Sequence, residues 1–502
     1  MTLIFDNQTP FEAIQFETLD QFDAGFHVFV AKVSYTIDRV EGGEGSLLTE
    51  METPAPLAVE DEYWGQMHLS GVRHESDLAP YKPRCDILVN ATAHAPGGKP
   101  TRRFDVRLRV RNSATPAALP EAPRGLNPLQ DPSDKEVDHW QRAVAYARSH
   151  PIPGATLIDK TLTINGERLF RKKARLFRLF WWTLKWASLG LIRRNPWKLS
   201  AAKKLTELPL RYESAFGGQC RINADDKGAQ KIPVKLRLSP EQLAQHPDEN
   251  PPMVHTLCEL NPLGQGFTEA WYLKATKQKR IPAPQIESPA APINAKLFWH
   301  VLNGKLKKVK PQQLASFVPA GMGAIGRAWL PRRALIGEIE IKAQWAEDEV
   351  PNLPPEFDHG YWNAAPRDQQ CAHLNGNEHF SLTNLCAADH PAATLDARRQ
   401  TQLHFQLPGT LLYLALGDED GRIGAKRLSI DTVIIDPEAG RVDVTWRAVI
   451  STLAQLGDAQ LRSANNEEER QRLSALLDWQ RKAPEEQTQA EPSTEALVEV
   501  SA

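Results

Sequence analysis

Several stretches of the chain alternate apolar and polar residues, which is the pattern of a strand with one buried and one solvated face. Apolar and charged residues alternate within 103–111, and residues 335–345 repeat the alternation. Residues 26–37 are rich in β-branched and aromatic side chains, and residues 156–165 have the same pattern. These patterns predict a strand at each place, with one more at 86–93.

A hairpin is predicted late in the chain. Residues 428–435 form its first strand, residues 436–440 (Asp-Pro-Glu-Ala-Gly) form the turn, and residues 441–449 form its second strand. Proline and glycine between two apolar runs are typical of such a turn. The strand predictions together indicate a mainly β protein, with β-sandwich-like sheets in one or two β-rich units and a few helices.

Two segments carry the start signals of helices. Ser133, with Glu136 three residues later, forms a capping box that predicts a helix over about 133–150. Near the C-terminus, Asn466 precedes three glutamates and a stripe of leucines. This order of residues predicts a C-terminal helix within the segment 451–482.

The basic segment 168–204 contains 12 Lys or Arg and no Asp or Glu. Within it, residues 176–192 form an apolar run that only two cations interrupt. At 100° per residue one face carries Leu176, Phe180, Leu184, Ala187 and Leu191, and the opposite face carries Arg171, Arg178 and Lys185. This arrangement predicts a basic amphipathic helix in an insertion at 171–204. The candidate partner-binding residues are Arg178, Trp181, Trp182, Lys185 and Trp186.

Three environments for this helix remain open from its sequence. Its apolar face can pack on the protein's own β core, dock on an acidic partner protein, or lie on an anionic membrane surface, where tryptophan favours the interface. The two charges inside the apolar run argue against a membrane-spanning helix.

The net charge of −2 conceals the basic segment. The 60 basic and 62 acidic residues divide into +12 within 168–204 and −14 elsewhere, where 48 basic residues face 62 acidic ones. Because the remaining surface is acidic, no nucleic-acid partner is expected. Residues 483–502 hold five Glu and neither Lys nor Arg, which predicts a disordered acidic tail. The 38 prolines disfavour a helical bundle, and 13 tryptophans allow a sizeable core.

The sequence also indicates a compartment. The N-terminus lacks a basic stretch followed by an apolar core, and no run of 18 uncharged apolar residues occurs, so neither a secretory signal nor a transmembrane helix is expected. The five cysteines are an odd number and widely spaced, which favours reduced thiols and a cytoplasmic location.

Two partial motifs have plainer interpretations than their functional ones. Residues 321–326 match GxGxxG, but a proline falls where the required helix would run, so a glycine-rich turn is expected. The spacings of Cys371 with His373 and of Cys386 with His390 are unusual for zinc, so buried cysteines and surface histidines are expected. No catalytic residue, cofactor or metal site is predicted.

Short motifs rich in glycine, proline and aromatic residues recur along the chain. They are YKPRCDI at 81–87, NGERLF at 165–170, PLRYESAFGG at 209–218, NPLGQG at 261–266, IPAPQIE at 281–287, WLPRR at 329–333, NAAPRDQQ at 363–370, DTV at 431–433 and WRA at 446–448. The ordered set resembles the bacterial family called domain of unknown function 2169, over about residues 1–450. Motif residues interpreted as structural are Lys82, Pro83, Asp86, Phe216, Gly217, Gly218, Asn261, Pro262, Gly264, Trp329, Asp431, Trp446 and Arg447.

The resemblance implies a non-enzymatic role. Members of this family are encoded beside type VI secretion spike proteins and effectors, and they are regarded as cytoplasmic adaptors or chaperones that load an effector with a PAAR-type tip onto the spike. The expected partner is therefore a secreted effector or its PAAR-type tip, with the spike protein as a further candidate. Two alternatives remain: a hydrolase with a dispersed active site, and an accessory protein that attaches to a membrane surface through 171–204.

The chain departs from the family pattern at three places. Insertions lie near 112–156 and 171–204, and Phe170 stands where the family usually has tryptophan. The expected regions are an N-terminal β-rich region at 1–170, the basic insertion at 171–204, an irregular Pro/Gly-rich region at 205–300, a C-terminal β-rich region at 301–450, a helical segment at 451–482 and the acidic tail at 483–502.

Overall fold

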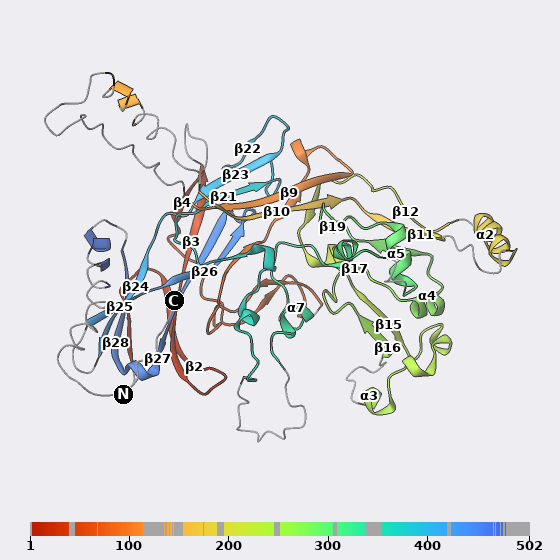
Figure 1. Ribbon diagram of the computed structural model, residues 1–502, viewed down its shortest axis with the longest axis horizontal. Helices are drawn as coiled ribbons and strands as arrows, with labels where there is room; N and C mark the ends of the chain where they lie inside the picture. The colour runs from red at the N-terminus through yellow and green to blue at the C-terminus, as the bar shows by residue number, and fades with distance from the viewer. Residues whose placement is uncertain are drawn as a thin grey trace.

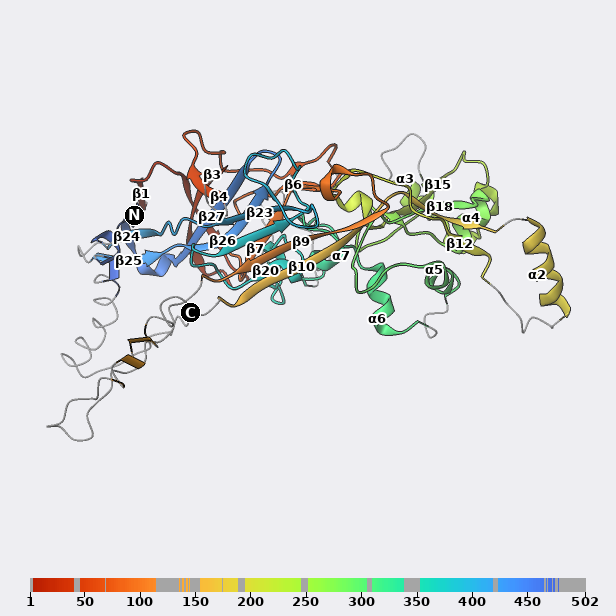
Figure 2. The same ribbon diagram turned by 90° about the horizontal axis from the view of Figure 1, so that it is seen from above.

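Strands make up most of the regular structure. The computed structural model describes residues 3–39, 46–113, 154–244, 252–304, 309–337, 353–418 and 423–464, apart from residues 68, 174 and 188–194, together with parts of 135–144 and 466–477. A large sheet and one small sheet lie towards one end of the molecule, and several other small sheets lie towards the opposite end (Figure 1, Figure 2). The prediction of a mainly β protein is confirmed.

The large sheet has 13 strands, whose main path runs in the order β19-β10-β9-β21-β23-β4-β3-β27-β26-β7-β20. Its strands are β2 (Glu12–Leu19), β3 (Gly25–Arg39), β4 (Ser46–Glu50), β7 (Cys85–Val89), β9 (Arg103–Arg111), β10 (Thr156–Asn165), β19 (Ile286–Glu287), β20 (Gln370–Cys371), β21 (His379–Thr383), β22 (Thr394–Leu395), β23 (Thr401–Gln406), β26 (Ser429–Asp436) and β27 (Arg441–Ser451). Most neighbours are antiparallel, whereas β7 pairs with β26 in parallel. Strands far apart in the sequence are thus neighbours in the sheet.

The large sheet curls into a half-barrel, which brings its two ends towards each other. Lys160 of β10 lies near one end, and Asp368 lies in a 3₁₀ turn (Arg367–Gln369) immediately before β20 at the other. The Lys160 Nζ and Asp368 Oδ1 atoms are 2.7 Å apart. This ion pair therefore bridges the two ends of the curled sheet.

The alternation in the sequence places the core on one face of the sheet. In β9, Phe104, Val106, Leu108 and Val110 are all buried, while the charged residues between them are at least partly exposed. Strand β3 is buried along most of its length because other parts of the molecule cover both of its faces. The strands predicted at 26–37, 103–111 and 156–165 and the hairpin at 428–449 are confirmed.

Smaller sheets extend this body. The sheet β1-β28-β24-β25 comprises β1 (Ile4–Asn7), β28 (Leu456–Ser463), β24 (Leu412–Asp418) and β25 (Ile423–Arg427), and the sheet β12-β11-β18 comprises β11 (Arg168–Lys172), β12 (Trp197–Leu199) and β18 (Arg280–Ala283). Two-stranded pairs are formed by β5 (Glu62–Tyr63) with β6 (Val72–His74), β8 (Thr92–His94) with β13 (Glu207–Pro209), β14 (Phe216–Gly217) with β17 (Gln265–Gly266), and β15 (Gln219–Asn223) with β16 (Pro252–Leu257). The helices are α2 (Arg175–Ala187), α3 (Pro240–Ala244), α4 (Ala270–Thr276), α5 (Ala295–Leu302), α6 (Pro311–Leu314) and α7 (Leu330–Arg333).

A second apolar core lies under the β12-β11-β18 sheet. The ring of Phe170 is fully buried there, and it stacks on Phe298 of α5 with ring centroids 4.0 Å apart. Trp197 contacts the same ring of Phe298 edge-on at 5.4 Å. Phe170 therefore occupies a core position that an aromatic ring fills.

The predicted helical segment 451–482 is wrong in its first half. Residues Leu456–Ser463 form strand β28, because this stretch pairs with β1 on one side and with β24 on the other. Tertiary pairing thus overrides the local sequence. The second half agrees with the prediction, since residues 468–471 are helical and the Glu469 amide donates to the Asn466 side chain at 2.9 Å.

Three further predictions fall partly or wholly outside the described residues. The described residues within 135–144 are helical, in line with the helix predicted at 133–150. Most of the strand predicted at 335–345 lies outside the description, as does the acidic tail at 483–502.

Truncating the stacked ring in the second core tests this account of the fold. We expect Phe170→Ala to lower the free energy of unfolding by about 3–5 kcal/mol, because it removes a fully buried aromatic side chain and leaves a cavity. Denaturant titration measures the change. Phe22→Ala is the matched control, since Phe22 is 71% exposed and its loss should change the stability by less than about 0.5 kcal/mol. Equal effects of the two substitutions would contradict the assignment of Phe170 to a core.

Candidate functional site

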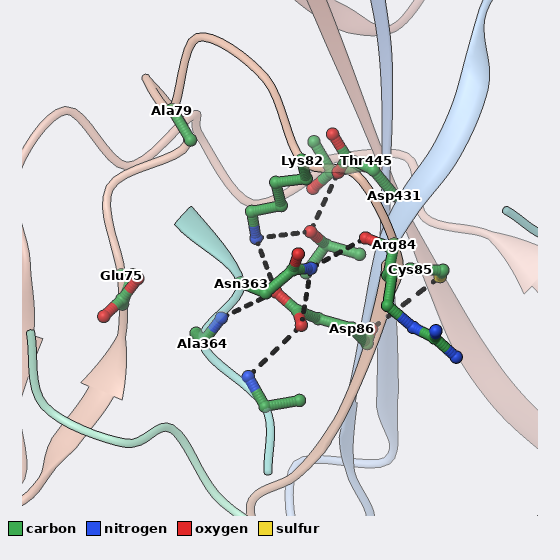
Figure 3. Close-up of polar contacts among 12 residues, drawn as sticks. Glu75, Ala79, Lys82, Arg84, Cys85, Asp86, Asn363, Ala364, Asp431 and Thr445 are labelled. Atoms are coloured by element: carbon green, nitrogen blue, oxygen red, sulfur yellow. Dashed lines mark hydrogen bonds and ion pairs between the residues drawn. The ribbon is translucent and has the colours of Figure 1, made fainter. Parts of the chain in front are cut away.

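The Asp86 carboxylate lies at the centre of a buried polar cluster (Figure 3). It accepts hydrogen bonds from Lys82 Nζ at 3.0 Å and from Asn363 Nδ2 at 3.0 Å. The backbone amides of Ala364 and Ala365 donate to the same carboxylate at 2.8 and 3.2 Å. Two distant sequence motifs, at 81–87 and at 363–370, therefore meet at this one side chain.

The Lys82 ammonium joins this cluster to the late hairpin. It donates to Thr432 Oγ1 of β26 at 2.8 Å as well as to Asp86. Burial disfavours the charged form of Lys82, but the neighbouring carboxylates of Asp86 and Asp431 outweigh it and raise the Lys82 pKa above its usual value. The ammonium therefore stays charged in a fully enclosed position.

A second buried pair continues the network. Arg447 Nε of β27 donates to Asp431 Oδ2 of β26 at 2.6 Å, and Arg447 Nη1 donates to the backbone carbonyl of Ala79. Both side chains are at most 4% exposed. Motif residues from both strands of the hairpin thus hold the segment that leads into β7.

A separate cluster joins two glycine-containing motifs around Asn261, which is fully buried. Its Nδ2 donates to the backbone carbonyls of Tyr212 and Phe216 at 2.8 and 3.0 Å. A Cβ at Gly217, where φ is +155°, would lie 2.1 Å from the Asn261 carbonyl oxygen. A side chain therefore cannot fit at this position, which explains the glycine there.

A third cluster is centred on Glu287. Arg168 Nη2 donates to Glu287 Oε1 at 2.8 Å, and Asn165 Nδ2 donates to the same oxygen at 2.7 Å. The backbone amide of Ile293 donates to Glu287 Oε2 at 2.8 Å. The motifs at 165–170 and 281–287 are therefore connected in the same manner as the others.

These clusters give the motif residues a structural role. Each buried carboxylate at their centres is neutralised by a cation and accepts additional hydrogen bonds, which is what a stable buried charge requires. Such an arrangement fixes the positions of strands and loops. The motifs that identify the sequence are thus the framework of the protein.

The framework borders an open cavity of about 800 Å³. Tyr212 and Trp329 contribute to its wall, with their rings in edge-to-face contact at 5.2 Å. Arg332 also lines the cavity, where it forms a buried ion pair with Glu75 and donates through Nε to the Tyr361 carbonyl at 2.9 Å. The volume lies within the usual range for ligand pockets.

Lys160 is a buried charged residue of this cavity that the sequence patterns did not single out. Its side chain is only 7% exposed, and burial lowers its pKa from the usual value although Asp368 opposes the shift. A signal was present in the sequence, because Lys160 stands between Ile158 and Leu162 on the buried face of an alternating strand. A charged residue at a core position indicates a buried ion pair or a functional site, since lysine is rarely buried unless it is paired.

The basic segment forms the helix predicted for it, α2 (Arg175–Ala187), which stands away from the body at the far end of the molecule (Figure 1, Figure 2). Trp182 and Trp186 are 55% and 69% exposed, and Lys185 is exposed as well. The side chains of Arg178 and Trp181 lie outside the described part of the structure. Phe180, which belongs to the apolar face of the helix, is 60% exposed, so packing on the protein's own core is wrong for this side chain.

No described helix is long and apolar enough to cross a membrane. Residues 321–326 form bends and irregular backbone, turn residues follow at 327–328, and a Cβ at Gly321 would lie 2.6 Å from the Tyr212 ring. The glycine-rich turn interpretation of this motif is thereby confirmed.

Cys371 and His373, two of the residues weighed as zinc ligands, have different neighbours. Cys371 lies opposite Cys85 in the antiparallel register of β20 with β7, and His373 Nε2 lies 2.9 Å from the Lys82 carbonyl oxygen. Within the described residues, no group of three or more Cys, His, Asp or Glu is placed to hold a metal ion. All five cysteines are buried free thiols.

The protein is thus a β-rich protein with a curled sheet, and the residues of its sequence motifs form the buried clusters that hold this sheet together. Comparison with known families agrees with the motif assignment: the family described as "Uncharacterized protein conserved in bacteria (DUF2169)" matches residues 24–118 and 132–447. The chain belongs to this family. No curated protein and no solved structure matches it.

Replacing the central carboxylate tests the framework. We expect Asp86→Asn to lower the free energy of unfolding by about 3–5 kcal/mol, because Lys82 would be left as a buried charge with no carboxylate in contact. Thermal and denaturant unfolding of the full chain measure the effect. The matched control is Asp159→Asn, whose carboxylate pairs with Arg107 at 2.6 Å on the exposed face of the sheet. That substitution should cost less than about 1 kcal/mol, and a comparable loss from both would refute the special role of Asp86.

Proposed function

We propose that this protein is a non-enzymatic adaptor that binds a secreted effector, or the PAAR-type tip of one, and helps to load it onto a type VI secretion spike. Family membership supports this proposal through the gene neighbourhood that the family resemblance implies. The single structural observation that carries it is the exposed aromatic surface of α2.

Four large apolar side chains on α2 are exposed to solvent: Leu179, Phe180, Trp182 and Trp186 are 56%, 60%, 55% and 69% exposed. Trp182 and Trp186 lie side by side, with ring centroids 6.0 Å apart. Contiguous exposed apolar side chains of this kind mark interaction surfaces. Tryptophan is also the residue that most often dominates binding energy at protein interfaces.

The charge around this surface indicates what kind of partner it fits. Helix α2 lies within the segment of 12 Lys or Arg and no acidic residue, and Lys185 is exposed between the two tryptophans. A complementary surface would be apolar at its centre and acidic at its rim. In this proposal α2 docks on a surface of the effector, or of its tip, that is apolar at its centre and acidic at its rim.

The framework clusters explain why α2 can serve this purpose. Strand β11, which leads into α2, is fixed by the Arg168–Glu287 pair, and β12, which follows it, belongs to the second core through Trp197. The helix is therefore presented from a rigid base. A rigid base reduces the entropy lost on binding.

Co-purification with the PAAR-tipped effector encoded beside the gene tests the proposal. We expect the protein to co-purify with this effector and to raise its soluble yield. The double substitution Trp182→Ala with Trp186→Ala should weaken binding at least tenfold, because two exposed aromatic anchors are removed, while the melting temperature stays unchanged.

The matched control is Phe22→Ala, which removes an equally exposed aromatic residue, 71% exposed, outside α2. It should leave binding unchanged. Absence of any complex with the effector would overturn the adaptor proposal. Flotation of the protein with phosphatidylglycerol vesicles, lost in the double variant, would instead favour the membrane-surface alternative.

A further inference from the structure

The cavity of about 800 Å³ runs across the edge of strand β10. Lys160 and Thr161 are consecutive residues of β10, so their side chains point to opposite faces of the sheet. Both line the cavity, together with Leu162. Three consecutive residues of β10 thus line one cavity, which is the arrangement found where a cavity borders the edge of a strand.

In the described structure this edge of β10 makes few backbone pairings, although the 3₁₀ turn at Arg367–Gln369 lies close to it. On one side, β9 pairs with β10 from Thr156 to Asn165. On the cavity side, β19 pairs only with Thr163 and Ile164. The backbone beside Lys160 therefore offers hydrogen-bonding groups to an incoming extended chain, as in strand addition to a sheet edge.

The Lys160 ammonium supplies a cation beside this edge. Its side chain is 7% exposed, and the one partner that the described residues give it is Asp368 at 2.7 Å. Asp368 itself is 64% exposed, so its carboxylate can turn into water at little cost. A lysine ammonium has three donors, so two remain for a ligand. Because burial lowers the Lys160 pKa despite Asp368, a better-placed carboxylate would stabilise the charged form.

The remaining wall suits the end of a peptide. Arg84 and Arg367 are exposed at the cavity and add positive charge. Trp329, Val318, Pro319 and Pro331 supply rigid apolar surface. The cavity thus combines a free strand edge, a buried cation with a displaceable partner, and an apolar wall.

We propose that this cavity binds the C-terminal end of an extended peptide, whose backbone adds to the edge of β10 and whose terminal carboxylate replaces Asp368 at Lys160. As a recognition site for cargo it rests on the proposed adaptor function. The site lies in the seam of the curled sheet, apart from α2, so the two contacts are separable.

The test uses the purified full-length chain and two pools of N-acetylated hexapeptides, randomised at every position but without Asp or Glu. One pool ends in a free carboxylate, and the other is identical but amidated. Peptides retained by the immobilised protein are counted by mass spectrometry. The wild-type protein should retain the carboxylate pool at least tenfold more than the amidated pool, since a charge-assisted hydrogen bond is lost on amidation.

Three variants sharpen the result. Lys160→Met keeps the side-chain volume without the charge and should abolish the preference for the carboxylate. Asp368→Asn removes the competing carboxylate and should increase retention of the carboxylate pool several-fold, which a purely structural role of the pair would not produce. Lys203→Met is the matched control, because Lys203 pairs with Glu167 at 2.5 Å on the exposed surface. It should behave as the wild type.

Equal retention of the two pools, or an unchanged preference in Lys160→Met, would overturn this proposal. The measurement needs no effector, so it is independent of the adaptor proposal. A carboxylate preference without any effector complex would leave the site standing and refute the adaptor function. An effector complex together with equal retention of the two peptide pools would leave the adaptor function standing and refute the peptide site.

Discussion

The burial of the Asp86 charge is the constraint on which the rest of the structure depends. A carboxylate with no exposed surface is stable only if a cation and several hydrogen-bond donors surround it. Here the donors come from two parts of the chain, because Lys82 precedes β7 and Asn363 to Ala365 lie some 280 residues later. A third part holds the cation in place, since Thr432 of β26 accepts a hydrogen bond from Lys82. The parallel pairing of β7 with β26, near the β20 end of the sheet, places Asp86 opposite Thr432.

The buried clusters of the framework and the surfaces proposed for binding have different roles. Buried pairs at Asp86, Asp431 and Glu287 fix the positions of the strands, and they leave little charge available for contact with other molecules. The features to which we assign contacts with other molecules are the tryptophans of α2 and the cavity at Lys160 of β10. Helix α2 and strand β10 lie in different parts of the fold (Figure 1). Rigid support and accessible surface are therefore built from different residues, and each can be altered without the other.

Much of the fold could be predicted from the sequence. Alternation in β9 and β10 and the turn before β27 are local signals, and they were sufficient for the strands themselves. Strand β28 was not predictable, because its structure comes from pairing with β1 and β24 at the two sides. The exposure of α2 was also beyond the sequence, since an amphipathic pattern does not tell what covers the apolar face.

The candidate site was only partly visible in the sequence. The motifs identified the residues of the framework, but not the contacts that join Lys82 to Thr432 or Arg168 to Glu287, which depend on the folded chain. The cavity lies where the two ends of the sheet meet, and Lys160 and Asp368 are separated by 208 positions. A buried lysine at a core position was the one local clue to it.

Hydrogen exchange in the native full-length chain tests the central claim most directly. If the Asp86 cluster is the framework of the fold, the amides of Ala364 and Ala365, which sit in a loop but donate to the buried carboxylate, should exchange only through global unfolding, at the rate of the central strands. Exchange of these two amides at the rate of exposed loops, while β26 and β27 stay protected, would contradict the account.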